Sequence, residues 1–463
     1  MVLAAGGGTR MKSRVPKVLH LAAGRPLLAH VLAALEPLEL GSTYAVVPRN
    51  TSIFESVLGD AGLADSLRLV VQDPPQGTAD ALKTALAALE GDPQTILVLQ
   101  GDSPLIKTET VDALLHVHQD SSAAATILTA QVSNPTGYGR VIRASDGSVE
   151  RIVEERDASY EERSIAEINA GSYVFDVAAL RDALGEVEAA NSQNEYYLTD
   201  VVPVLVAKGL GASAYRAPPQ EVLGVNSRTQ LAAVTQILRR RTCELWMEEG
   251  VTVVDPNTTY IDATVTLARD AIVYPFSFLE GKTTVAEGAE VGPQVRIVDS
   301  DIGENATVSF AVVRESSIGP EASVGPFASL RPGTRLERGA RLGTFVESKQ
   351  TTIGEESKAN HLAYLGDAQI GKGVNVGAGT ITCNWDGQHK HATVIDDEAY
   401  IGSDTMLVAP THVGKRAATG AGSVVRGDVP DEALAVGVPA RIIEGKGNKM
   451  RPKDGGKAKE PRQ

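Results

Sequence analysis

The chain opens on a glycine-rich stretch suited to holding phosphate groups. Leu3-Ala4-Ala5-Gly6-Gly7-Gly8-Thr9-Arg10-Met11 follows a very short apolar run, and Pro16-Lys17 comes soon after it. Glycines let backbone N–H groups approach phosphates and bases closely, and Arg10 and Lys17 supply cations that neutralise a triphosphate. Glycines alone also fit a plain tight turn, but the full string with its two cations favours nucleotide binding.

Later apolar runs in this region end in groups that bind metals and bases. Asp102 follows the run 97–101, and a carboxylate there is placed to hold Mg²⁺, which takes oxygen ligands. An Asp that caps the next turn is the alternative. Gln72 and Gln76-Gly77-Thr78-Ala79 lie between a predicted strand and a predicted helix, where Thr78 taken alone equally fits a helix N-cap.

Farther along, a histidine stands among cations. His361 begins the run His361-Leu362-Ala363-Tyr364-Leu365-Gly366-Asp367. An imidazole can remove a proton from an amine that attacks a thioester. Arg331, Lys349 and Lys390, with the phenol of Tyr364, are the groups that fix a phosphate dianion. From spacing alone, scattered surface cations and a structural histidine explain these residues equally well.

The first half of the chain alternates between strands and helices. We predict strands over 43–47, 67–71, 95–99 and 123–128 and helices over 79–89 and 109–118. This alternation indicates an α/β domain with a mostly parallel sheet, whose ligands bind beyond the carboxyl ends of the strands.

A helix is predicted over 227–249 as the link to the rest of the chain. Its apolar residues Leu231, Val234, Leu238 and Leu245 fall near one face. The triplet Arg239-Arg240-Arg241 is interpreted as a solvated face or an intersubunit contact rather than a site.

From about residue 251 to residue 438, aliphatic residues recur every six positions. A helical period of 3.6 or a strand period of 2 does not explain six, whereas coils of three short strands, each with one inward side chain, do. Small or β-branched residues two positions earlier leave room for the corners. The predicted inward residues are Ile261, Leu267, Val273, Leu279, Val285, Val291 and Ile297, then, after a slip, Val312, Ile318, Val324, Leu330, Leu336 and Leu342, and finally Ile401, Leu407 and Val413.

Composition narrows the function classes. The chain has 463 residues, 44 Lys and Arg against 58 Asp and Glu, and a formal net charge of -14, which argues against a general binder of nucleic acids or anionic membranes. Cys243 and Cys383 are the two cysteines, too few for a disulfide framework or a Cys-based zinc site. The apolar runs are too short to span a bilayer and no signal-peptide pattern is present, so a cytoplasmic protein is expected.

The glycine string resembles the sugar-nucleotidyltransferase family, and together with the six-residue repeat the chain resembles the bacterial bifunctional enzymes that join such a domain to a hexapeptide-repeat acyltransferase. The resemblance runs from Met1 to about Pro439. It implies a Rossmann-like α/β nucleotidyltransferase domain (1–226), a helical linker (227–249) and a left-handed parallel β-helix (250–440). The basic tail (441–463) is expected to be disordered.

For the first domain, the resemblance implies uridyl transfer from UTP to N-acetylglucosamine-1-phosphate. Arg10 and Lys17 would be the catalytic cations, with Mg²⁺ on Asp102 and Asn226. UTP and UDP-N-acetylglucosamine would contact Leu3, Ala4, Ala5, Gly6, Lys17, Gln72, Gly77, Thr78, Gln100, Gly101, Asp102, Gly139, Glu154, Asn169 and Asn226. Without the resemblance, Glu154 belongs to a solvated acidic run and Asn226 is a helix cap.

For the second domain, the resemblance implies acetylation of glucosamine-1-phosphate from acetyl-coenzyme A, with His361 as general base. The sugar phosphate would contact Arg331, Glu347, Lys349, Tyr364, Asn375 and Lys390. The coenzyme would contact Ala378, Asn384, Trp385, Ser403 and Ala421. A homotrimer is implied too, because such acyltransferases place their sites between neighbouring coils.

Three departures from the resemblance stand out. Gly7 and Trp385 replace the usual Lys and Tyr, and near Val436-Gly437-Val438-Pro439-Ala440-Arg441 the expected Arg is displaced. The run Met1-Val2-Leu3 is short for a central strand, so we expect a start upstream of Met1, which an intact-mass measurement tests. Two rival interpretations remain: a single-function nucleotidyltransferase whose β-helix only oligomerises, and a non-enzymatic scaffold of the same two folds.

Overall fold

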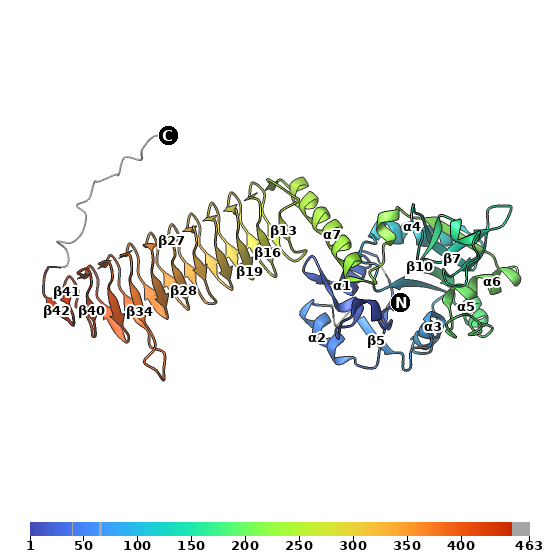
Figure 1. Cartoon of the computed structure of the whole chain (residues 1–463), viewed down its shortest axis with the longest axis horizontal. Helices are drawn as coiled ribbons and strands as arrows, with labels where there is room; N and C mark the ends of the chain where they lie inside the picture. The colour runs from blue at the N-terminus through green and yellow to red at the C-terminus, as the bar shows by residue number, and fades with distance from the viewer. Residues whose placement is uncertain (39, 64–66, 447–463) are drawn as a thin grey trace. The chain divides into compact units, whose positions relative to one another are not determined.

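The computed structural model describes residues 1–38, 40–63 and 67–446 (Figure 1). The chain divides into two compact units, one from Met1 to Leu238 and one that begins at Arg239. The division falls inside helix α7 (Arg228–Glu248), which lies within the predicted linker.

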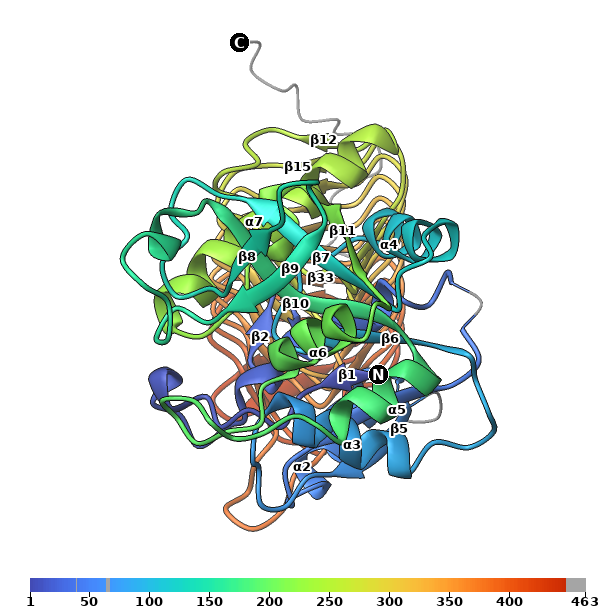
Figure 2. The same ribbon diagram turned by 90° about the vertical axis from the view of Figure 1, so that its right-hand side faces the viewer.

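The first unit is built on a mixed, mostly parallel sheet with the strand order β11-β7-β10-β6-β1-β4-β5 (Figure 2). β10 runs antiparallel to both of its neighbours and also pairs with β8, which forms a hairpin with β9. The strands are β1 Val2–Leu3, β2 Leu21–Ala22, β3 Arg25–Pro26, β4 Thr43–Val47, β5 Leu67–Val71, β6 Thr95–Gln100, β7 Ala125–Gln131, β8 Arg140–Arg143, β9 Val149–Val153, β10 Glu167–Asp176 and β11 Ala212–Arg216.

Helices cover both faces of this sheet. The helices are α1 Leu27–Ala33, α2 Ser52–Asp60, α3 Thr78–Ala87, α4 Thr108–Asp120, α5 Val177–Leu184 and α6 Val201–Ala207, with short 3-10 turns η1 Thr9–Met11, η2 Lys17–Leu19, η3 Glu162–Ser164, η4 Leu198–Asp200 and η5 Pro219–Val222. Successive strand residues enter different cores: Val2 packs with α1, α2 and α4, and Leu3 packs with α3, α5 and α6. The alternation follows from the two-residue period of a strand. The predicted strands 43–47 and 67–71 are confirmed, and strand 123–128 is shifted to β7.

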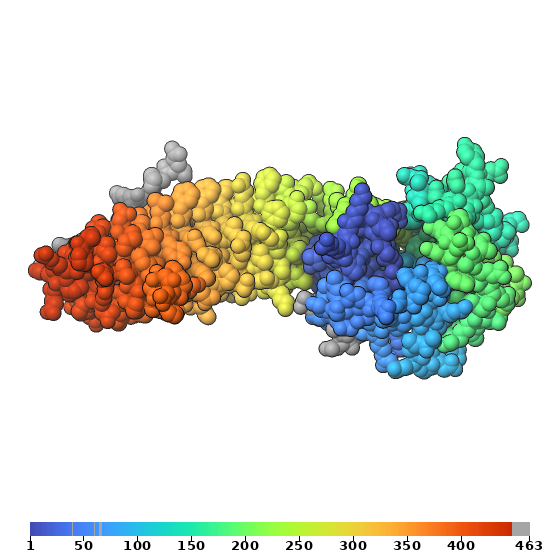
Figure 3. Space-filling view, turned by 60° about the horizontal axis from the view of Figure 1, so that its bottom comes forward, coloured from blue at the N-terminus to red at the C-terminus, as the bar shows by residue number. Residues whose placement is uncertain are grey.

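The second unit is a parallel β-helix whose short strands stack into three sheets (Figure 1). In the space-filling view, the stacked coils form a continuous rod whose colour runs from yellow to red along the chain (Figure 3). The first sheet contains β12 Thr252–Val253, β15 Ile272–Val273, β18 Glu290–Val291, β21 Thr307–Val308, β24 Ser323–Val324, β27 Arg341–Thr344, β30 Lys358–His361, β33 Asn375–Val376, β36 Tyr400–Ile401, β39 Ala418–Thr419, β41 Leu434–Gly437 and β42 Ala440–Ile443. The second contains β13 Tyr260–Ile261, β16 Phe278–Glu280, β19 Arg296–Val298, β22 Val312–Arg314, β25 Ser329–Leu330, β28 Glu347–Lys349, β31 Tyr364–Gly366, β34 Ile381–Cys383, β37 Met406–Val408 and β40 Val424–Val425. The third contains β14 Thr266–Leu267, β17 Thr284–Val285, β20 Asp301–Ile302, β23 Ser317–Ile318, β26 Arg335–Leu336, β29 Thr352–Ile353, β32 Ala368–Ile370, β35 Thr393–Ile395 and β38 Thr411–Val413.

The predicted inward residues form the core of the prism, with one exception. Ile261 to Ile297 and Ile318 to Leu342 are buried at the predicted spacing of six. The corner hydroxyls are buried too: Ser277 and Thr283 donate to the carbonyls of Tyr274 and Glu280, at 2.7 Å each. A small residue at the corner therefore also satisfies a backbone acceptor of the turn.

The predicted slip of register is real, but Val312 was the wrong inward residue. Val313 is fully buried and Val312 is half-buried. The inward positions after Ile297 are Ile302, Val308, Val313 and Ile318, so three of the four intervals contain five residues instead of six. Each five-residue interval has a corner that is one residue shorter. A count in steps of six along the sequence does not show where these shorter corners lie.

Two features of helix α7 differ from the predictions. Leu245 is 53% exposed, and Cys243, Trp246 and Met247 pack against the prism instead. Arg239 is not a solvated cation, because its guanidinium lies 3.2 Å from the ring centroid of Tyr260 and donates to the Thr259 carbonyl at 2.9 Å. The residues of the linker therefore cover the first coil and close its apolar end.

The predicted disordered tail begins too early. Residues Arg441 to Ile443 belong to β42, which pairs antiparallel with β41, so this part of the 441–463 assignment is wrong. Residues 447–463 lie outside the described part of the chain. Among the described helices, none has the length and apolar character to cross a membrane.

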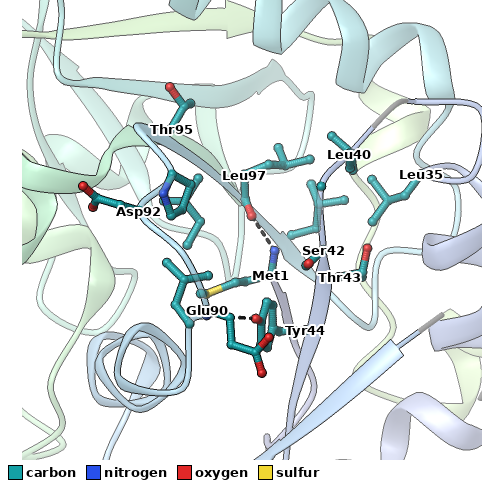
Figure 4. A pocket seen from close by; sticks show the side chains of 15 residues that line it. Met1, Leu35, Leu40, Ser42, Thr43, Tyr44, Glu90, Asp92, Thr95 and Leu97 are labelled. Carbon is teal, nitrogen blue, oxygen red and sulfur yellow. Dashed lines mark hydrogen bonds between the residues drawn. The ribbon is translucent and has the colours of Figure 1, made fainter. Parts of the chain in front are cut away.

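A cavity of about 370 Å³ lies at the amino end of β1 (Figure 4). The Met1 amino group donates to the Leu97 carbonyl at 2.6 Å, and burial lowers its pKa to about 5. No predicted site residue is among the described residues that line this cavity. The nucleotide motif follows the opposite, carboxyl end of β1.

The register of the prism can be tested with an isosteric pair of variants. Val313→Thr buries a hydroxyl among aliphatic side chains and should lower the free energy of unfolding of the β-helix by about 1–3 kcal/mol. Val312→Thr, the matched control, should lower it by about 0.5 kcal/mol or less. Denaturant unfolding followed by circular dichroism measures both; equal losses would contradict the assigned register.

Candidate active sites

A cavity of about 340 Å³ lies beyond the carboxyl ends of β1 and β6. Eleven of its lining residues were predicted: Leu3, Ala4, Ala5, Gly6, Lys17, Gln72, Gly77, Thr78, Gln100, Asp102 and Glu154. The parallel pairing of Leu3 with Gln100 places the two loops that follow these strands side by side. This is the position where a doubly wound sheet binds its ligand.

At one side of this cavity, Lys17 connects the two predicted metal ligands. Its ammonium donates to the Asp102 carboxylate and to Asn226 Oδ1, the latter at 2.9 Å. The Val225 N–H donates to the Asp102 carbonyl at 2.9 Å, which holds Asn226 beside the carboxylate. Lys17 itself can approach because residue 8 is glycine: a Cβ there would lie 2.8 Å from Cβ of Lys17.

The side-chain oxygens of Asp102 and Asn226 both accept from the Lys17 ammonium. The same two oxygens are therefore close enough to bind one metal ion. Carboxylate and amide oxygens suit a hard divalent ion that takes its other ligands from phosphates and water. Within the described residues, no group of three or more His, Cys, Asp or Glu could hold a metal. The protein ligands are therefore few, and they fit an ion that is shared with a nucleotide.

Gln72, Gly77 and Thr78 form one wall of the cavity. The Gln72 amide donates to the Gly77 carbonyl at 3.1 Å and to Asp80 at 2.7 Å. Thr78 is the first residue of α3 rather than its N-cap, and its hydroxyl accepts from the Leu198 N–H at 2.9 Å. Gly77 has a φ of 119°, and a Cβ there would lie 2.4 Å from the Tyr196 carbonyl oxygen.

Gly139, Glu154 and Asn169 meet at the end of the β8–β9–β10 strands. The Asn169 N–H donates to the Gly139 carbonyl at 2.9 Å, and a Cβ on Gly139 would lie 3.3 Å from a carboxylate oxygen of Glu154. The Asn169 side chain donates to the Tyr173 hydroxyl at 2.7 Å. Gln100, of uncertain role in the sequence, donates to the Gly171 carbonyl at 2.8 Å.

Glu154 is a largely buried carboxylate that lines this cavity. Burial raises its pKa, and the negative charge of Asp200 raises it further. Asp200 is likewise affected: burial and then Asp157 raise its pKa. The negative charge of Glu154, Asp200 and Asp157 therefore favours a ligand whose hydroxyl groups donate hydrogen bonds to Glu154.

Arg10 and Gly7 of the glycine-rich stretch differ in their relation to the cavity. Arg10 lies on η1, is exposed, and is not among the described lining residues. Gly7 does line the cavity, and a Cβ there meets nothing within 4 Å, so the space that a lysine would need is open.

Besides Gly7 and the apolar residues Val18, Pro75 and Ala81, three polar lining residues were missed: Gln193, Glu195 and Tyr197. They come from the loop between α5 and η4, which reaches the cavity because the Ala79 N–H donates to the Tyr196 carbonyl at 2.9 Å. The sequence of this loop contains no motif that would indicate a binding role. Its position beside the cavity depends on its tertiary contact with α3.

The second site begins on the second sheet of the β-helix, where cations gather. Arg331 and Lys349 follow Leu330 and Ser348, which pair in register on neighbouring coils. The ammonium of Lys390 lowers the pKa of Lys349, and Arg331 adds to this effect. Positive groups held this close to one another favour an anionic ligand.

Polar residues continue this surface. Glu347 pairs in register with Tyr364 and accepts from Arg331 at 2.9 Å. The Asn384 amide donates to Asp367 and to the Tyr364 hydroxyl, the latter at 3.4 Å. The coil stays intact through these polar residues, with Ser348 buried at an inward position.

His361 is exposed at the last position of β30, at the corner that precedes Tyr364. Ala359 pairs with Val376, and the Gly379 N–H donates to the Leu362 carbonyl at 3.1 Å. His361 and Ala378 therefore occupy equivalent positions on successive coils. Asn375, in turn, pairs with Lys358 on β30.

The predicted coenzyme contacts continue along the same edge. Val376 pairs with Ile401, so Ala378 and Ser403 are equivalent, and the pairing of Tyr400 with Ala418 places Ala421 next in the row. Trp385 is 57% exposed on the loop after β34, where it forms a bridge with Lys390. This loop projects from the coil in Figure 1.

His389 and His391, the two histidines of this loop, differ in their exposure. His389 is exposed. His391 is half-buried instead and lies 2.7 Å from Asp386. The pKa of Asp386 falls to about 2, because the backbone N–H of His389, the His391 ring and the Gln388 N–H all stabilise its charge.

Comparison with known sequences identifies the family of this chain. A family described as a MobA-like NTP transferase domain matches residues 1–190. A relative from Thermobifida fusca is 50% identical over 458 residues, which are 98% of this chain and 94% of the relative. Relatives from Carboxydothermus hydrogenoformans and Halalkalibacterium halodurans are 46% and 43% identical over 94% of this chain and 96% and 95% of their own lengths. All three are named bifunctional protein GlmU.

The chain belongs to the bifunctional GlmU family.

Membership of the GlmU family confirms the resemblance found in the sequence. The chain is an enzyme with uridyltransferase and glucosamine-1-phosphate acetyltransferase activities in UDP-N-acetylglucosamine synthesis. The single-function and scaffold alternatives are not favoured.

In this GlmU-family enzyme, Gly77→Ala should impair uridyl transfer at least about tenfold, because the added Cβ displaces the Tyr196 backbone and the loop behind it. Gly91→Ala is the matched control, since its φ is also positive but nothing lies within 4 Å of a Cβ. Acetyl transfer should survive in both variants. Uridyl transfer that is equally impaired in both would show that backbone strain alone, and not the loop contact, is responsible.

Proposed function

We propose that the predicted residues carry out two reactions in sequence. The β-helix acetylates glucosamine-1-phosphate, and the first unit then joins the product to the uridyl group of UTP. The observation that best supports the assignment is the gathering of Arg331, Lys349 and Lys390 on neighbouring coils, since such a cluster is stabilised by a phosphate dianion.

For acetyl transfer, the cations hold the sugar phosphate so that its amine faces the thioester. The His361 imidazole takes a proton as the amine attacks the carbonyl carbon, and the coenzyme thiol leaves. The Ala378 N–H, one coil farther along, would donate to the developing oxyanion. Asn384 and Trp385 would contact the coenzyme, with Ser403 and Ala421 along the same edge.

For uridyl transfer, a phosphate oxygen of N-acetylglucosamine-1-phosphate attacks the α-phosphorus of UTP and pyrophosphate leaves. Gln72 and Gly77 border the base, and Glu154, Asn169 and Gly139 border the sugar. Lys17 and Arg10 offset the charge that develops on the phosphates. No side-chain nucleophile is needed.

Asp102 and Asn226 would hold Mg²⁺ when the nucleotide binds, and the ion would supply further charge neutralisation at the phosphates. Lys17, which now donates to both side chains, would be free to contact a phosphate. We propose that the reactions take place in the cytoplasm and that their product is used in peptidoglycan synthesis.

The enzyme is proposed to be a homotrimer. Phe327 is 56% exposed at a corner of the prism, with ring centroids of Phe310 and Phe345 at 5.7 and 5.5 Å. Phe310 and Phe327 border a groove of about 720 Å³ together with Phe276 and Phe278. Phe310, Phe327 and Phe345 all have a positive φ, which is rare for bulky residues. We call these three residues the aromatic ladder, and their common backbone conformation and exposure support a shared role.

Two variants separate the activities. With glucosamine-1-phosphate, acetyl-coenzyme A, UTP and Mg²⁺ in one tube, His361→Ala should reduce thiol release by about 10²–10⁴-fold. Asp102→Asn should instead abolish pyrophosphate release and leave thiol release intact. In His361→Ala, pyrophosphate release should return when N-acetylglucosamine-1-phosphate is supplied. Unchanged thiol release in His361→Ala would contradict the role of the imidazole.

The oligomer is tested by Phe327→Glu, which places a charge in the aromatic ladder. Sedimentation velocity should show a monomer in place of a trimer, and acetyl transfer should fall while uridyl transfer persists. Tyr160→Glu, at a side chain that is 91% exposed, is the control and should remain trimeric. A monomeric unaltered enzyme, or a trimeric Phe327→Glu variant, would contradict the proposed interface.

A further inference from the structure

Arg140 is a buried cation next to the proposed sugar subsite. It is 1% exposed and ranks among the largest fully buried side chains of the described residues. Its backbone lies between Ile168 of β10 and Val153 of β9. Each of these three residues immediately adjoins a predicted sugar contact: Gly139, Asn169 and Glu154.

The guanidinium of Arg140 connects three segments around that subsite. One end donates to the Tyr138 carbonyl, directly before Gly139. The other donates to the Glu155 carboxylate at 2.5 Å, directly after Glu154, and to the Arg163 carbonyl of η3 at 3.4 Å. Among the described residues, Nε has no hydrogen-bond partner.

A buried guanidinium costs more free energy than a purely structural role would require. Burying a guanidinium costs desolvation, and a well-packed apolar side chain would often stabilise a fold as well or better. A planar fork, however, holds several acceptors at fixed positions, which an ammonium or an apolar group cannot do. The acceptors here are the backbone and the side chain that flank the residues proposed to bind the sugar.

We propose that Arg140 is a positioning residue for the N-acetylglucosamine-1-phosphate subsite: by holding the Tyr138 carbonyl and the Glu155 carboxylate, it sets the spacing between Gly139 and Glu154. The inference rests on the proposed function of that subsite. Arg140 does not touch the substrate in this account.

The charge of Arg140 gives the arrangement a second effect, on the ionisation of Glu154. The groups that face Glu154 are the carboxylates of Asp200 and Asp157, the Thr199 hydroxyl, the phenols of Tyr173 and Tyr197, and Arg140. Burial and the two Asp charges raise the pKa of Glu154, whereas Arg140 lowers it. Loss of the cation should therefore raise that pKa further and remove the carboxylate acceptor at a higher pH.

The same strand offers a matched control. Arg143 also pairs with a carboxylate, donating to both oxygens of Glu167 at 2.7 and 2.8 Å. Its side chain is partly exposed, and its other bond reaches the Gly147 carbonyl of the β8–β9 hairpin loop. Arg143→Met thus breaks an Arg–Glu pair of β8 at the end of the strand away from Gly139.

Uridyl-transfer kinetics of the full chain test the proposal in Arg140→Lys, Arg140→Met, Glu155→Gln and Arg143→Met. In the first two, KM for N-acetylglucosamine-1-phosphate should rise about tenfold or more while KM for UTP stays within about twofold, because only the sugar contacts are misplaced. Glu155→Gln should give a smaller rise of the same kind. Arg143→Met should change neither constant.

The pH profile separates positioning from charge. Arg140→Met should shift the acid limb of kcat/KM for the sugar phosphate to higher pH, because protonated Glu154 persists there. Arg140→Lys keeps the cation and should keep the limb of the unaltered enzyme. Acetyl transfer, measured on the same samples, should be unchanged, because it takes place in the other unit, and circular dichroism of the same samples reports whether the first unit is folded.

Two results would overturn the inference. One is a fall in kcat with both KM values unchanged in Arg140→Lys and Glu155→Gln, which indicates a smaller amount of folded enzyme. The other is an equal effect in Arg143→Met. Glu154→Ala distinguishes failure of the proposed function itself: an unchanged KM for the sugar phosphate in that variant would show that the subsite lies elsewhere.

Discussion

In both units, the side chains of the candidate sites are held by strands whose backbone N–H and C=O groups are hydrogen-bonded in register. Leu3 beside Gln100 brings the glycine loop to Asp102, and Glu347 beside Tyr364 brings residues of successive coils onto one surface. A register shift of one residue would turn each of these side chains to the opposite face. Catalytic geometry therefore depends on the apolar cores that fix the register, since those cores specify which residue points inward.

In the proposed mechanism, the two candidate sites bind phosphate in different ways. In the first unit, Lys17 is already paired with Asp102, so cationic charge becomes available only when another positive ion binds the carboxylate. In the β-helix, Lys349 and Lys390 face each other, and a dianion relieves their repulsion directly. A nucleotide that arrives with a metal suits the first arrangement, and a sugar monophosphate suits the second. This difference in charge balance matches the division of labour between a nucleotidyltransferase and an acyltransferase.

Both departures from regular patterns in this chain follow from local packing. The β-helix loses a residue at three sides near Val308 and keeps its core, because a corner can be shortened while the inward position is retained. The same tolerance lets the long loop with Trp385 and Lys390 extend from a corner without disturbing the strands before and after it. A solenoid can thus acquire a binding surface by altering its corners alone.

The sequence by itself determined the fold class of both units and the identity of most candidate site residues. Spacing of six specifies a prism because each side needs one aliphatic side chain, and glycines with flanking cations mark a phosphate loop because few other arrangements use them. Tertiary structure alone decided which of Val312 and Val313 points inward, that Arg239 stacks on Tyr260, and that Gln193, Glu195 and Tyr197 line the candidate nucleotide cavity. Those outcomes depend on which segments, distant in the chain, pack against each other, and a local pattern carries no information about such contacts.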